Sequence, residues 1–536
     1  MNPAGRARAR GADAAACRAV ARPPGRPARM AMLAAALLAA ACVGPNFHRP
    51  APPQDAGYSA APLPLETAEA PAPGGEAQHF NAAADVSWQW WTLFQSPRLN
   101  SLVELAFKKN PSIRNAQAAL RQAQEMTAAQ RGFFFPTVGL DYNFERQKVA
   151  GNLANSVAPG VQGNGTVIQA VQNPKGPVYN EPLFYNFHTA EATVAYNPDV
   201  FGSNRRQVES LAAQAEIQRY NLEAAYMALA SNLVSAAIQE ASVRDQLAAV
   251  RDIVAENRHA LDILRRQFKD GYVMRGDVAA QEAQLAQAQA LAPPLEKELE
   301  QTRDLIRALA GELPDQDVGD SFEFKDMKLP RELPLTVPSK LVDQRPDVRA
   351  AEAQLHSANA DVGTAIAARL PVFSITGAAG GTATEFTQMF AQGGPFWNII
   401  LGVAQPVFDG GTLRHRQHAA EQALIQAATQ YQSTVLAAYQ NVADTLHAIY
   451  SDADELAAAL HNEEAAKVQL DITRLQMTSG QVGEIYLLQA EEAYQQAVLN
   501  RIQAQAVRFG DSAALFMALG GGWWNRPAGR GPDPGA

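Results

Sequence analysis

The residue with the clearest chemical signal in this sequence is Cys42, which ends the apolar stretch LLAAAC. Three alanines, Ala39 to Ala41, stand directly before it, and small residues before a cysteine are typical of the cleavage site of exported lipoproteins. After cleavage, Cys42 would carry diacylglycerol on its thiol and an acyl chain on its amino group, which exceeds the two lipid signals that stable anchoring requires. We therefore predict lipid attachment at Cys42; a buried thiol at a chance position is the alternative.

The segment before Cys42 is predicted to be a lipoprotein signal peptide over residues 1–41. Its apolar run, residues 31–41, falls short of the ~20 residues that a membrane-spanning helix needs. Seven arginines precede this run. The positive part is long for a signal peptide, so Met30 is an alternative start. The only other cysteine, Cys17, lies in this leader, and the mature chain is therefore expected to have no disulfide.

Other groups that could do chemistry lack the partners that they would need. His415 and His418 are spaced to share a helix face, but no third metal ligand stands nearby in the sequence. The glycines of GAAGG, residues 377–381, are followed by no lysine, so a phosphate loop is not supported. We find no nucleophile elbow and no zinc-binding HExxH. We therefore predict no catalytic residue, no metal and no cofactor, and the net charge of −9 argues against nucleic acid as a partner.

An internal repeat organises the remainder of the chain. NPSIRNAQAALRQAQEMTAAQRGFFFP at residues 110–136 and RPDVRAAEAQLHSANADVGTAIAARLP at residues 345–371 place two prolines at the same spacing around an amphipathic helix. Further on, LDILRRQFKDG ends at Gly271 and LDITRLQMTSG ends at Gly480. The first copy is longer between these landmarks, and its extra residues indicate an exposed loop at 150–177.

Two stretches without glycine or proline, residues 203–270 and 412–479, predict very long helices. At 1.5 Å per residue each would reach roughly 100 Å, and such a helix must pack in a coiled-coil-like bundle to bury its apolar stripe. Returning helices are expected from 277 towards 310, with a break at the Pro293–Pro294 pair, and from 484 towards 508. The chain is therefore predicted to form two long helical hairpins.

The tips of these hairpins fall on glycines, which permit tight turns. They are Gly271 and Gly276 in the first copy and Gly480 and Gly483 in the second. These four residues are candidates for contact with a partner at the tips. A turn without any partner is the alternative.

Each copy also contains a pair of segments in which apolar and polar residues alternate, as in a strand with one apolar face. They are TVGLDYNFE (137–145), TAEATVAYN (189–197), VFSITGAAG (372–380) and WNIILGVAQ (397–405). Strands of this length cross an outer membrane when tilted. Four strands cannot close a barrel, and open edges are not tolerated in lipid, so the chain must oligomerise. Two copies would give a barrel filled by side chains, whereas three copies would give twelve strands and a lumen.

Several motifs in these elements resemble the outer-membrane factors of tripartite efflux systems, the TolC family, and most closely its NodT-type lipoprotein branch. They are CVGPNFHRP, WWTLFQSPRLNSLVELAFKKNPSIRNAQAALRQA, the 345–371 segment, QPVFDGGTLR and ALGGGW. The resemblance covers residues 42–523. It implies a mainly α fold with a small membrane β part: a homotrimer whose twelve-stranded barrel, four strands per chain, stands on a long α-helical coiled-coil tunnel.

The resemblance also implies a function without chemistry of its own. The chain would sit in the outer membrane, extend into the periplasm, and passively conduct drugs or other small molecules from an inner-membrane pump of the RND type. A periplasmic adaptor would contact the tip glycines.

The resemblance further implies an aperture at the periplasmic end of the tunnel, often lined by acidic residues in the family. The family positions fall on Tyr486 and Gln489, which are neutral here. The nearby carboxylates Asp277 and Glu484 are therefore the candidate aperture residues. Ordinary carboxylates at helix starts, favoured by the helix dipole, are the alternative.

The expected organisation has six parts. They are the signal peptide 1–41, an acylated strap 42–97, a first repeat 98–311, an equatorial linker 312–340, a second repeat 341–520 and a flexible tail 521–536. Two other functions remain open at this point: a conduit for type I protein secretion, and a periplasmic lipoprotein adaptor or spacer. The spacer would share the helical hairpins but not the two pairs of amphipathic strands.

Overall fold

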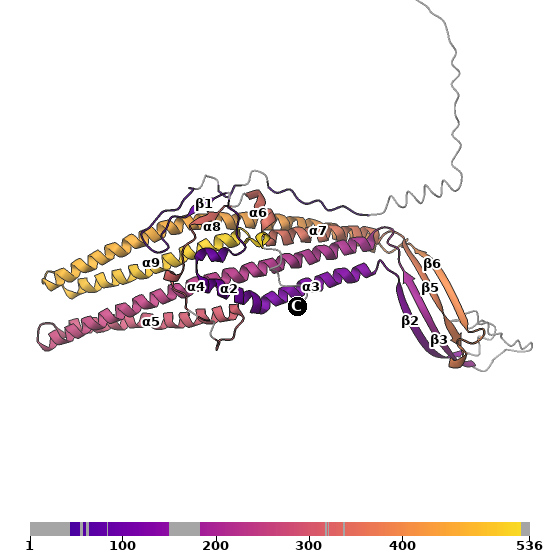
Figure 1. The fold of residues 1–536 in the computed structure, drawn as a ribbon, viewed down its shortest axis with the longest axis horizontal. Coiled ribbons are helices and arrows are strands. Elements are labelled where there is room, and N and C mark those ends of the chain that lie inside the picture. The colour runs from indigo at the N-terminus through magenta and orange to yellow at the C-terminus, as the bar shows by residue number, and fades with distance from the viewer. Residues whose placement is uncertain are drawn as a thin grey trace, which may run out of the picture.

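The computed structural model describes residues 43–53, 57–59, 64–82, 84–149, 183–316, 319, 321–335 and 338–526. The predicted signal peptide, Cys42 and the expected loop at 150–177 lie outside these residues. The chain forms an elongated helical body with a four-stranded sheet at one end (Figure 1). The tips of both long hairpins lie at the other end of the body, far from the sheet.

The internal repeat is visible as helices of matched length. Helices α3 (Pro111–Gly132) and α7 (Pro346–Ala367) each have 22 residues and start at a proline. Proline suits this position because the first N–H groups of a helix have no intrahelical partner. Helices α4 (Ser203–Lys269) and α8 (Thr412–Thr478) each have 67 residues and confirm the two very long helices that the sequence predicts.

The returning helices complete the two hairpins. Helix α5 (Arg275–Ala310) packs along α4, and α9 (Glu484–Ala518) packs along α8. The expected break at Pro293–Pro294 is wrong, because α5 continues through both prolines. Both prolines are exposed, and so are the residues at 289 and 290, whose carbonyls lose a hydrogen bond; water can replace that bond. Within the part of the chain that the structure describes, no helix is both long and apolar enough to cross a membrane.

Four strands form one antiparallel sheet in the order β2-β3-β5-β6. They are β2 (Thr137–Val149), β3 (Leu183–Tyr196), β5 (Val372–Ala383) and β6 (Pro395–Ala404). All four predicted strands are confirmed. Strands β2 and β6 lie at the two edges and run in opposite directions.

The strand register divides the sheet into an apolar and a polar face. Val138 pairs with Val194, Val194 with Gly377, and Gly377 with Ile399, so these four residues share one face. By the same alternation this face carries Leu140, Tyr142, Phe144, Trp397, Leu401 and Val403, all of them exposed. The opposite face carries Asp141, Glu191, Thr193, Thr376 and Asn398. The period-two pattern of the sequence therefore corresponds to the two faces of a real sheet.

Shorter elements lie around the middle of the helical body. They are α2 (Pro97–Lys109), α6 (Pro338–Gln344), the parallel pair β1 (His79–Asn81) and β4 (Glu332–Pro334), and the 3₁₀ turns Trp90–Phe94 and Phe324–Asp326. The largest buried side chains gather here, and Trp90 stacks on Phe516 of α9 with ring centroids 5.3 Å apart. Buried aromatic rings of this size contribute much of a core's apolar area.

The segment before α2 is tied to the second repeat by buried polar groups. Arg508 of α9 has no exposed surface, and its Nη2 donates to Thr67 Oγ1 at 3.2 Å and to the Glu76 carbonyl at 2.7 Å. Gln78 Nε2 donates to Ser512 Oγ at 2.9 Å. These hydrogen bonds tie the segment to α9, and all those of the Arg508 guanidinium come from Nη2, since its Nε and Nη1 are buried without a partner among the described residues.

The C-terminal residues that the structure describes are not a flexible tail. Residues 521–526 contain the 3₁₀ turn Trp523–Asn525. Trp523 Nε1 donates to the Gln344 carbonyl at 2.7 Å, and the Arg526 guanidinium lies 4.0 Å from the Trp88 ring centroid. The expectation of a flexible tail from residue 521 is therefore wrong up to residue 526, because aromatic packing and a cation–π contact hold this part.

Candidate functional site

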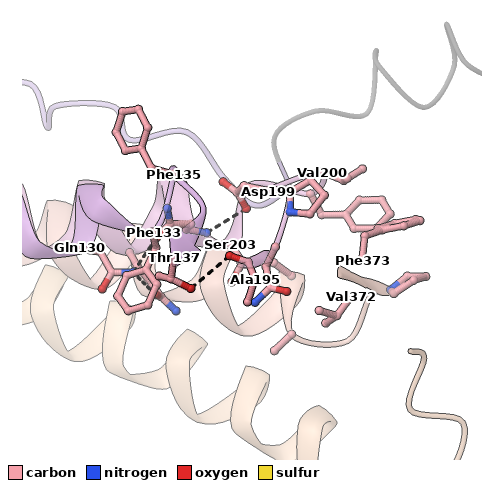
Figure 2. A pocket seen from close by; sticks show the side chains of 18 residues that line it. Gln130, Phe133, Phe135, Thr137, Ala195, Asp199, Val200, Ser203, Val372 and Phe373 are labelled. Carbon is pink, nitrogen blue, oxygen red and sulfur yellow. Dashed lines mark hydrogen bonds between the residues drawn. The ribbon is translucent and has the colours of Figure 1, made fainter. Parts of the chain in front are cut away.

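The helix-to-sheet junction contains an open pocket of about 440 Å³. It is lined by the end of α3, the starts of β2 and β5, the end of β3, the start of α4 and the end of α7. Figure 2 shows Phe133 and Phe135 at one end of this junction pocket and Val372 and Phe373 at the other. Phe133 and Phe135 are 63% and 71% exposed. The junction pocket is therefore an apolar hollow whose aromatic rim lacks a cover within the described chain.

Polar contacts fix the shape of the junction pocket. Gln130 Nε2 donates to Asn204 Oδ1 at 2.6 Å, which ties α3 to α4. Asp199 accepts from the backbone N–H groups of Asn204 and Arg205 at 3.0 and 2.9 Å, so its carboxylate satisfies N–H groups at the start of α4. These contacts give the pocket rigid walls and leave no acid–base pair aimed into it.

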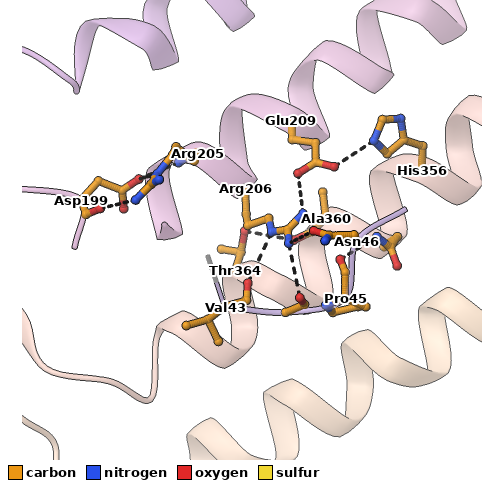
Figure 3. A network of polar contacts seen from close by, with 12 residues as sticks. Val43, Pro45, Asn46, Asp199, Arg205, Arg206, Glu209, His356, Ala360 and Thr364 are labelled. Carbon is orange, nitrogen blue, oxygen red and sulfur yellow. Dashed lines mark hydrogen bonds and ion pairs between the residues drawn. The ribbon is translucent and has the colours of Figure 1, made fainter. Parts of the chain in front are cut away.

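A second site at the same junction holds the first described residues of the chain (Figure 3). Arg206, on α4, donates from Nε to the Val43 carbonyl and from Nη2 to the Gly44 carbonyl, both at 3.3 Å. Its Nη2 also donates to Asn46 Oδ1 at 3.0 Å. Asn359 of α7 adds a bond from Nδ2 to the Pro45 carbonyl at 3.0 Å. We call these residues the strap clamp.

The strap clamp is tightly packed and charged. Gly44 has a φ of 104° and lies so close to Gly363 that a Cβ on Gly44 would be 2.5 Å from the Gly363 Cα, so no larger residue fits. Glu209 pairs with Arg206 at 2.7 Å and with His356 at 2.9 Å. Burial alone would raise the pKa of Glu209, but the hydrogen bonds from His356 and Arg206 hold this pKa below its ordinary value. The clamp therefore carries a stable negative charge beside Arg206.

The strap clamp holds Val43, the residue that follows the predicted lipid-bearing Cys42 in the sequence. Cys42 itself lies outside the described residues. Val43 also donates its N–H to the Phe201 carbonyl at 3.4 Å, next to the junction pocket. Lipid attachment at Cys42 stays a prediction. Sequence reasoning missed the role of Arg206, because nothing in the sequence links an arginine on a long helix to a segment so far away.

The four tip glycines differ in their roles. Gly271 and Gly480, with φ of 81° and 75°, adopt the left-handed conformation that ends α4 and α8. Gly276 and Gly483 do not, since Gly276 lies in the first turn of α5 and Gly483 precedes α9. No atom lies within 4 Å of a Cβ built on any of the four. All four therefore face open space, and only Gly271 and Gly480 require glycine for their backbone conformation.

The tip of the first hairpin also exposes apolar side chains that sequence reasoning missed. Tyr272 and Met274 are 81% and 78% exposed. Their signal was present, since GYVMRG places apolar residues inside a turn. Exposed apolar side chains at the end of a projecting hairpin are typical of a contact surface.

The candidate aperture residues fall into two groups. The Asp277 carboxylate accepts from the Met274 N–H at 2.8 Å and so caps α5, as the alternative interpretation expected. Glu484 starts α9, and burial, followed by the charges of Glu491 and Asp277, raises its pKa. The structure thus brings carboxylates of both hairpins close enough to interact. Tyr486 and Gln489 are both exposed.

A single arginine joins the two hairpins near these carboxylates. Arg474 Nη2, on α8, lies 3.2 Å from Glu256 Oε2 on α4 and 3.3 Å from Glu491 Oε1 on α9. Burial raises the pKa of Glu491, although Arg474 acts in the opposite direction. Arg474 was not singled out from the sequence, because the sequence does not show which helix of the other hairpin lies beside it.

The groups set aside in the sequence do not assemble into a site. The rings of His415 and His418 lie 6.2 Å apart at the start of α8. Among the described residues, no three metal-ligating side chains of histidine, cysteine, aspartate or glutamate come together. The glycines 377–381 lie within β5, where Gly380 and Gly381 touch neighbouring backbone. These two glycines therefore allow close packing of the strands around β5.

Comparison with known proteins agrees with this geometry. The model of the family described as outer membrane efflux protein matches residues 102–312 and 337–521. The pyoverdine export outer membrane protein OpmQ of Pseudomonas putida is 26% identical over 81% of this chain and 88% of its own length, and the outer membrane protein OprJ of Pseudomonas aeruginosa is 24% identical over 92% and 95%. The structure of the outer-membrane channel OprN has a TM-score of 0.75 at 25% identity, and covers 90% of this chain and 99% of its own. The chain belongs to the family of outer membrane efflux proteins.

Proposed function

We propose that three copies of the chain close one twelve-stranded barrel above one helical tunnel, and that this trimer is the outer-membrane conduit of a tripartite efflux system. The observation that carries the proposal is the sheet with one apolar face and two edge strands, β2 and β6, that run in opposite directions. Strand β6 of one copy can pair antiparallel with β2 of the next, so the ladder continues until the ring closes. Three copies give twelve strands, which enclose a lumen. Two copies would give eight strands, whose interior is filled by side chains.

Conduction in this assembly is passive. The polar face of the sheet lines the lumen, and the exposed apolar face, with Leu140 and Trp397, contacts lipid. The pump and the adaptor supply the energy and the selectivity, and the channel itself performs no catalysis. Drugs or other small molecules are the expected cargo.

The adaptor contacts the hairpin tips in this proposal. The surroundings of Gly271, Gly276, Gly480 and Gly483 are open, so that a partner backbone can approach them. The exposed Tyr272 supplies apolar contact area beside these glycines.

Lipid attachment at Cys42 anchors the strap to the membrane surface. The strap clamp supports this role, because it holds Val43 at the helix-side end of the sheet, where a membrane-spanning barrel meets water. An acyl anchor on the preceding residue would lie at the inner boundary of the outer membrane. Replacing Cys42 with serine, with the leader still removed, is expected to impair assembly more than conductance.

The aperture lies where the carboxylates of Asp277 and Glu484 approach each other, one from each hairpin. Arg474 keeps the hairpins together through Glu256 and Glu491. Opening the tunnel requires the two hairpins to move apart, and this movement breaks the bond from Arg474 to Glu256.

The mass and the conductance of the protein purified from outer membranes test the proposal together. A trimer mass with discrete channel openings in a planar bilayer is the expected result. A monomer without conductance would overturn the conduit and favour the periplasmic spacer. A trimer that conducts but supports export of a polypeptide, and of no small molecule, would favour the secretion conduit.

A further inference from the structure

The loop between β6 and α8 carries the two most exposed large apolar side chains of the described residues. Val407 is 94% exposed and Phe408 is 92% exposed. Large apolar side chains that project together from a protein surface usually mark a contact surface. The loop therefore needs a partner that the single chain does not provide.

This loop is held rigidly. Asp409 accepts from the backbone N–H of Gly411 at 2.9 Å and from that of Leu413 at 2.7 Å, so it caps α8. On the other side, Gln405 Nε2 donates to the Arg369 carbonyl at 3.0 Å. Because both ends of the loop are fixed, Val407 and Phe408 project in a defined direction and pay little entropy on binding. We call these two residues the apolar peg.

The junction pocket offers a surface of the matching kind. Phe133 and Phe135 form its exposed rim, immediately before the first residue of β2, Thr137. The peg comes immediately after the last residue of β6, Ala404. Strands β2 and β6 run in opposite directions, so the start of β2 and the end of β6 lie at the same, helix-side end of the sheet (Figure 1).

Within one chain the peg does not contact this rim. Strands β3 and β5 separate β2 from β6, and three strand spacings amount to about 14 Å. The exposure of Phe408 and of Phe135 shows that the two remain apart. In the closed ring, however, β6 of one copy lies one spacing, about 4.8 Å, from β2 of the next copy.

We propose that the apolar peg of one copy packs against the Phe133–Phe135 rim of the junction pocket of the next copy. The partner of this surface is thus a second copy of the same chain, and each pocket is incomplete without its neighbour. The inference rests on the proposed trimer and continues its edge pairing into the helical body. Such a lock fixes the register of β6 on β2, because a slip of one residue would turn every side chain to the wrong face.

The lipid–water boundary is the competing environment for Phe408, since aromatic residues are enriched there. The second copy is favoured by the rigid capping of the loop and by the position of the rim at the β2 edge, which meets β6 of the neighbouring copy in the closed ring. The test therefore includes a measurement of contact between residue 408 and lipid.

Cross-linking between differently tagged chains tests the proposal. One chain carries Phe408→Cys and the other Phe135→Cys; the mature sequence holds no cysteine except Cys42, and the unsubstituted protein controls for reaction at that residue. A short thiol cross-linker should yield a product that contains both tags within particles of trimer mass. Leu436→Cys paired with Phe135→Cys is the matched control. Leu436 is also an exposed apolar residue, 72% exposed, but it lies on α8 roughly 36 Å beyond the start of that helix, so this pair should yield no product.

Each outcome decides between the claims. Trimers without the 408–135 product, or strong quenching of a fluorophore on Phe408→Cys by lipid-borne nitroxides, would overturn the peg and leave the trimer intact. Failure to form trimers in the unsubstituted protein would overturn the proposed function instead. As an independent check, Phe408→Ser should lower the temperature at which the trimer dissociates in detergent, whereas Phe386→Ser, also on an exposed phenylalanine, should not. Equal dissociation temperatures would count against the peg.

Discussion

The two hairpins contain the same arginine–glutamate pair but use it differently. In the first hairpin, Arg265 Nη2 on α4 lies 3.0 Å from Glu282 Oε1 on α5. In the second, Arg474 Nη2 lies 3.3 Å from Glu491 Oε1, and also 3.2 Å from Glu256 Oε2 of the first hairpin. Both arginines follow the same LDI motif before a tip glycine. One cation therefore closes its own hairpin, and the other joins the two hairpins.

The interiors of the hairpins differ at matching positions as well. In the first, the buried Gln281 Nε2 donates to Asn257 Oδ1 at 2.9 Å. In the second, the residues at the same distances from the tip glycine are Ala466 and Ala490, both buried. The repeated backbone thus allows one hairpin to be held by an internal polar pair and the other by small apolar packing. We therefore expect the second hairpin to depend more on its link to the first.

Replacing Arg474 with alanine should have the largest effect. It removes the bond to Glu256 on the first hairpin, which opening breaks, as well as the pair with Glu491 inside the second hairpin. Only the bond to Glu256 differs between the closed and open states, and because the Arg474 and Glu256 side chains are 38% and 62% exposed, this pair contributes about 0.2–1 kcal/mol. We therefore expect a rise of up to about fivefold in the open-to-closed ratio of single channels. Arg265→Ala is the matched control and should change this ratio little. Equal effects of both substitutions would show that the hairpins do not differ in this respect.

Replacing Gln281 with alanine should destabilise the first hairpin by about 1 kcal/mol, because Asn257 Oδ1 loses its buried partner. The double variant Asn257→Ala with Gln281→Ala reproduces the alanine pair of the second hairpin and should recover part of this loss. Hydrogen exchange of the α5 amides would measure both variants. If the double variant lost as much stability as the sum of the two single substitutions, the polar pair would not act as a unit.

Lowering the pH should favour the closed state of the channel, in which the hairpin tips stay together. Burial raises the pKa of Glu491, and burial with the charges of Glu491 and Asp277 raises the pKa of Glu484. Each carboxyl binds a proton more strongly in the closed state, where burial raises its pKa, than in the open state, where it is solvated. The closed state therefore gains stability as the pH falls through the raised pKa towards the ordinary glutamate value of 4.5. Channel open probability should therefore fall severalfold as pH is lowered from neutral over this interval. Glu484→Gln should flatten that dependence, and an unchanged profile would remove Glu484 from the aperture.

Replacing Arg275 with alanine should have the smallest effect. Arg275 Nη2 lies 3.5 Å from Glu282 Oε2, and the two side chains are 66% and 35% exposed. Such pairs contribute less than about 0.5 kcal/mol in many cases. Neither the open probability nor the thermal stability of the trimer should shift measurably. A large effect would mean that this arginine contacts a partner in the assembled channel.

Much of the fold follows from local patterns in the sequence. The glycine-free stretches predicted α4 and α8 to within a residue, and the proline spacing predicted the equal lengths of α3 and α7. Period-two alternation located the four strands. Local patterns failed at Pro293–Pro294, where packing and solvent-exposed carbonyls outweigh the loss of two hydrogen bonds.

The candidate sites were predictable only where a single residue type reveals its role. The turn glycines Gly271 and Gly480 could be named because a tight turn requires a particular residue. Cys42 could be proposed for the same reason, and its lipid attachment stays a prediction. Arg206 and Arg474 could not be named, because arginines on long helices are common and most of them are solvated.

The sequence by itself determined the repeat, the lengths of the helices and the strands, and it supplied the candidate for lipid attachment, since each depends on the spacing of residues close together in the chain. Only the tertiary structure decided which residues meet across the fold. Arg206 reaches Val43 across 163 positions and Arg474 reaches Glu256 across 218. Such contacts depend on how packed helices are aligned, and that alignment is set by the whole core and not by any local pattern.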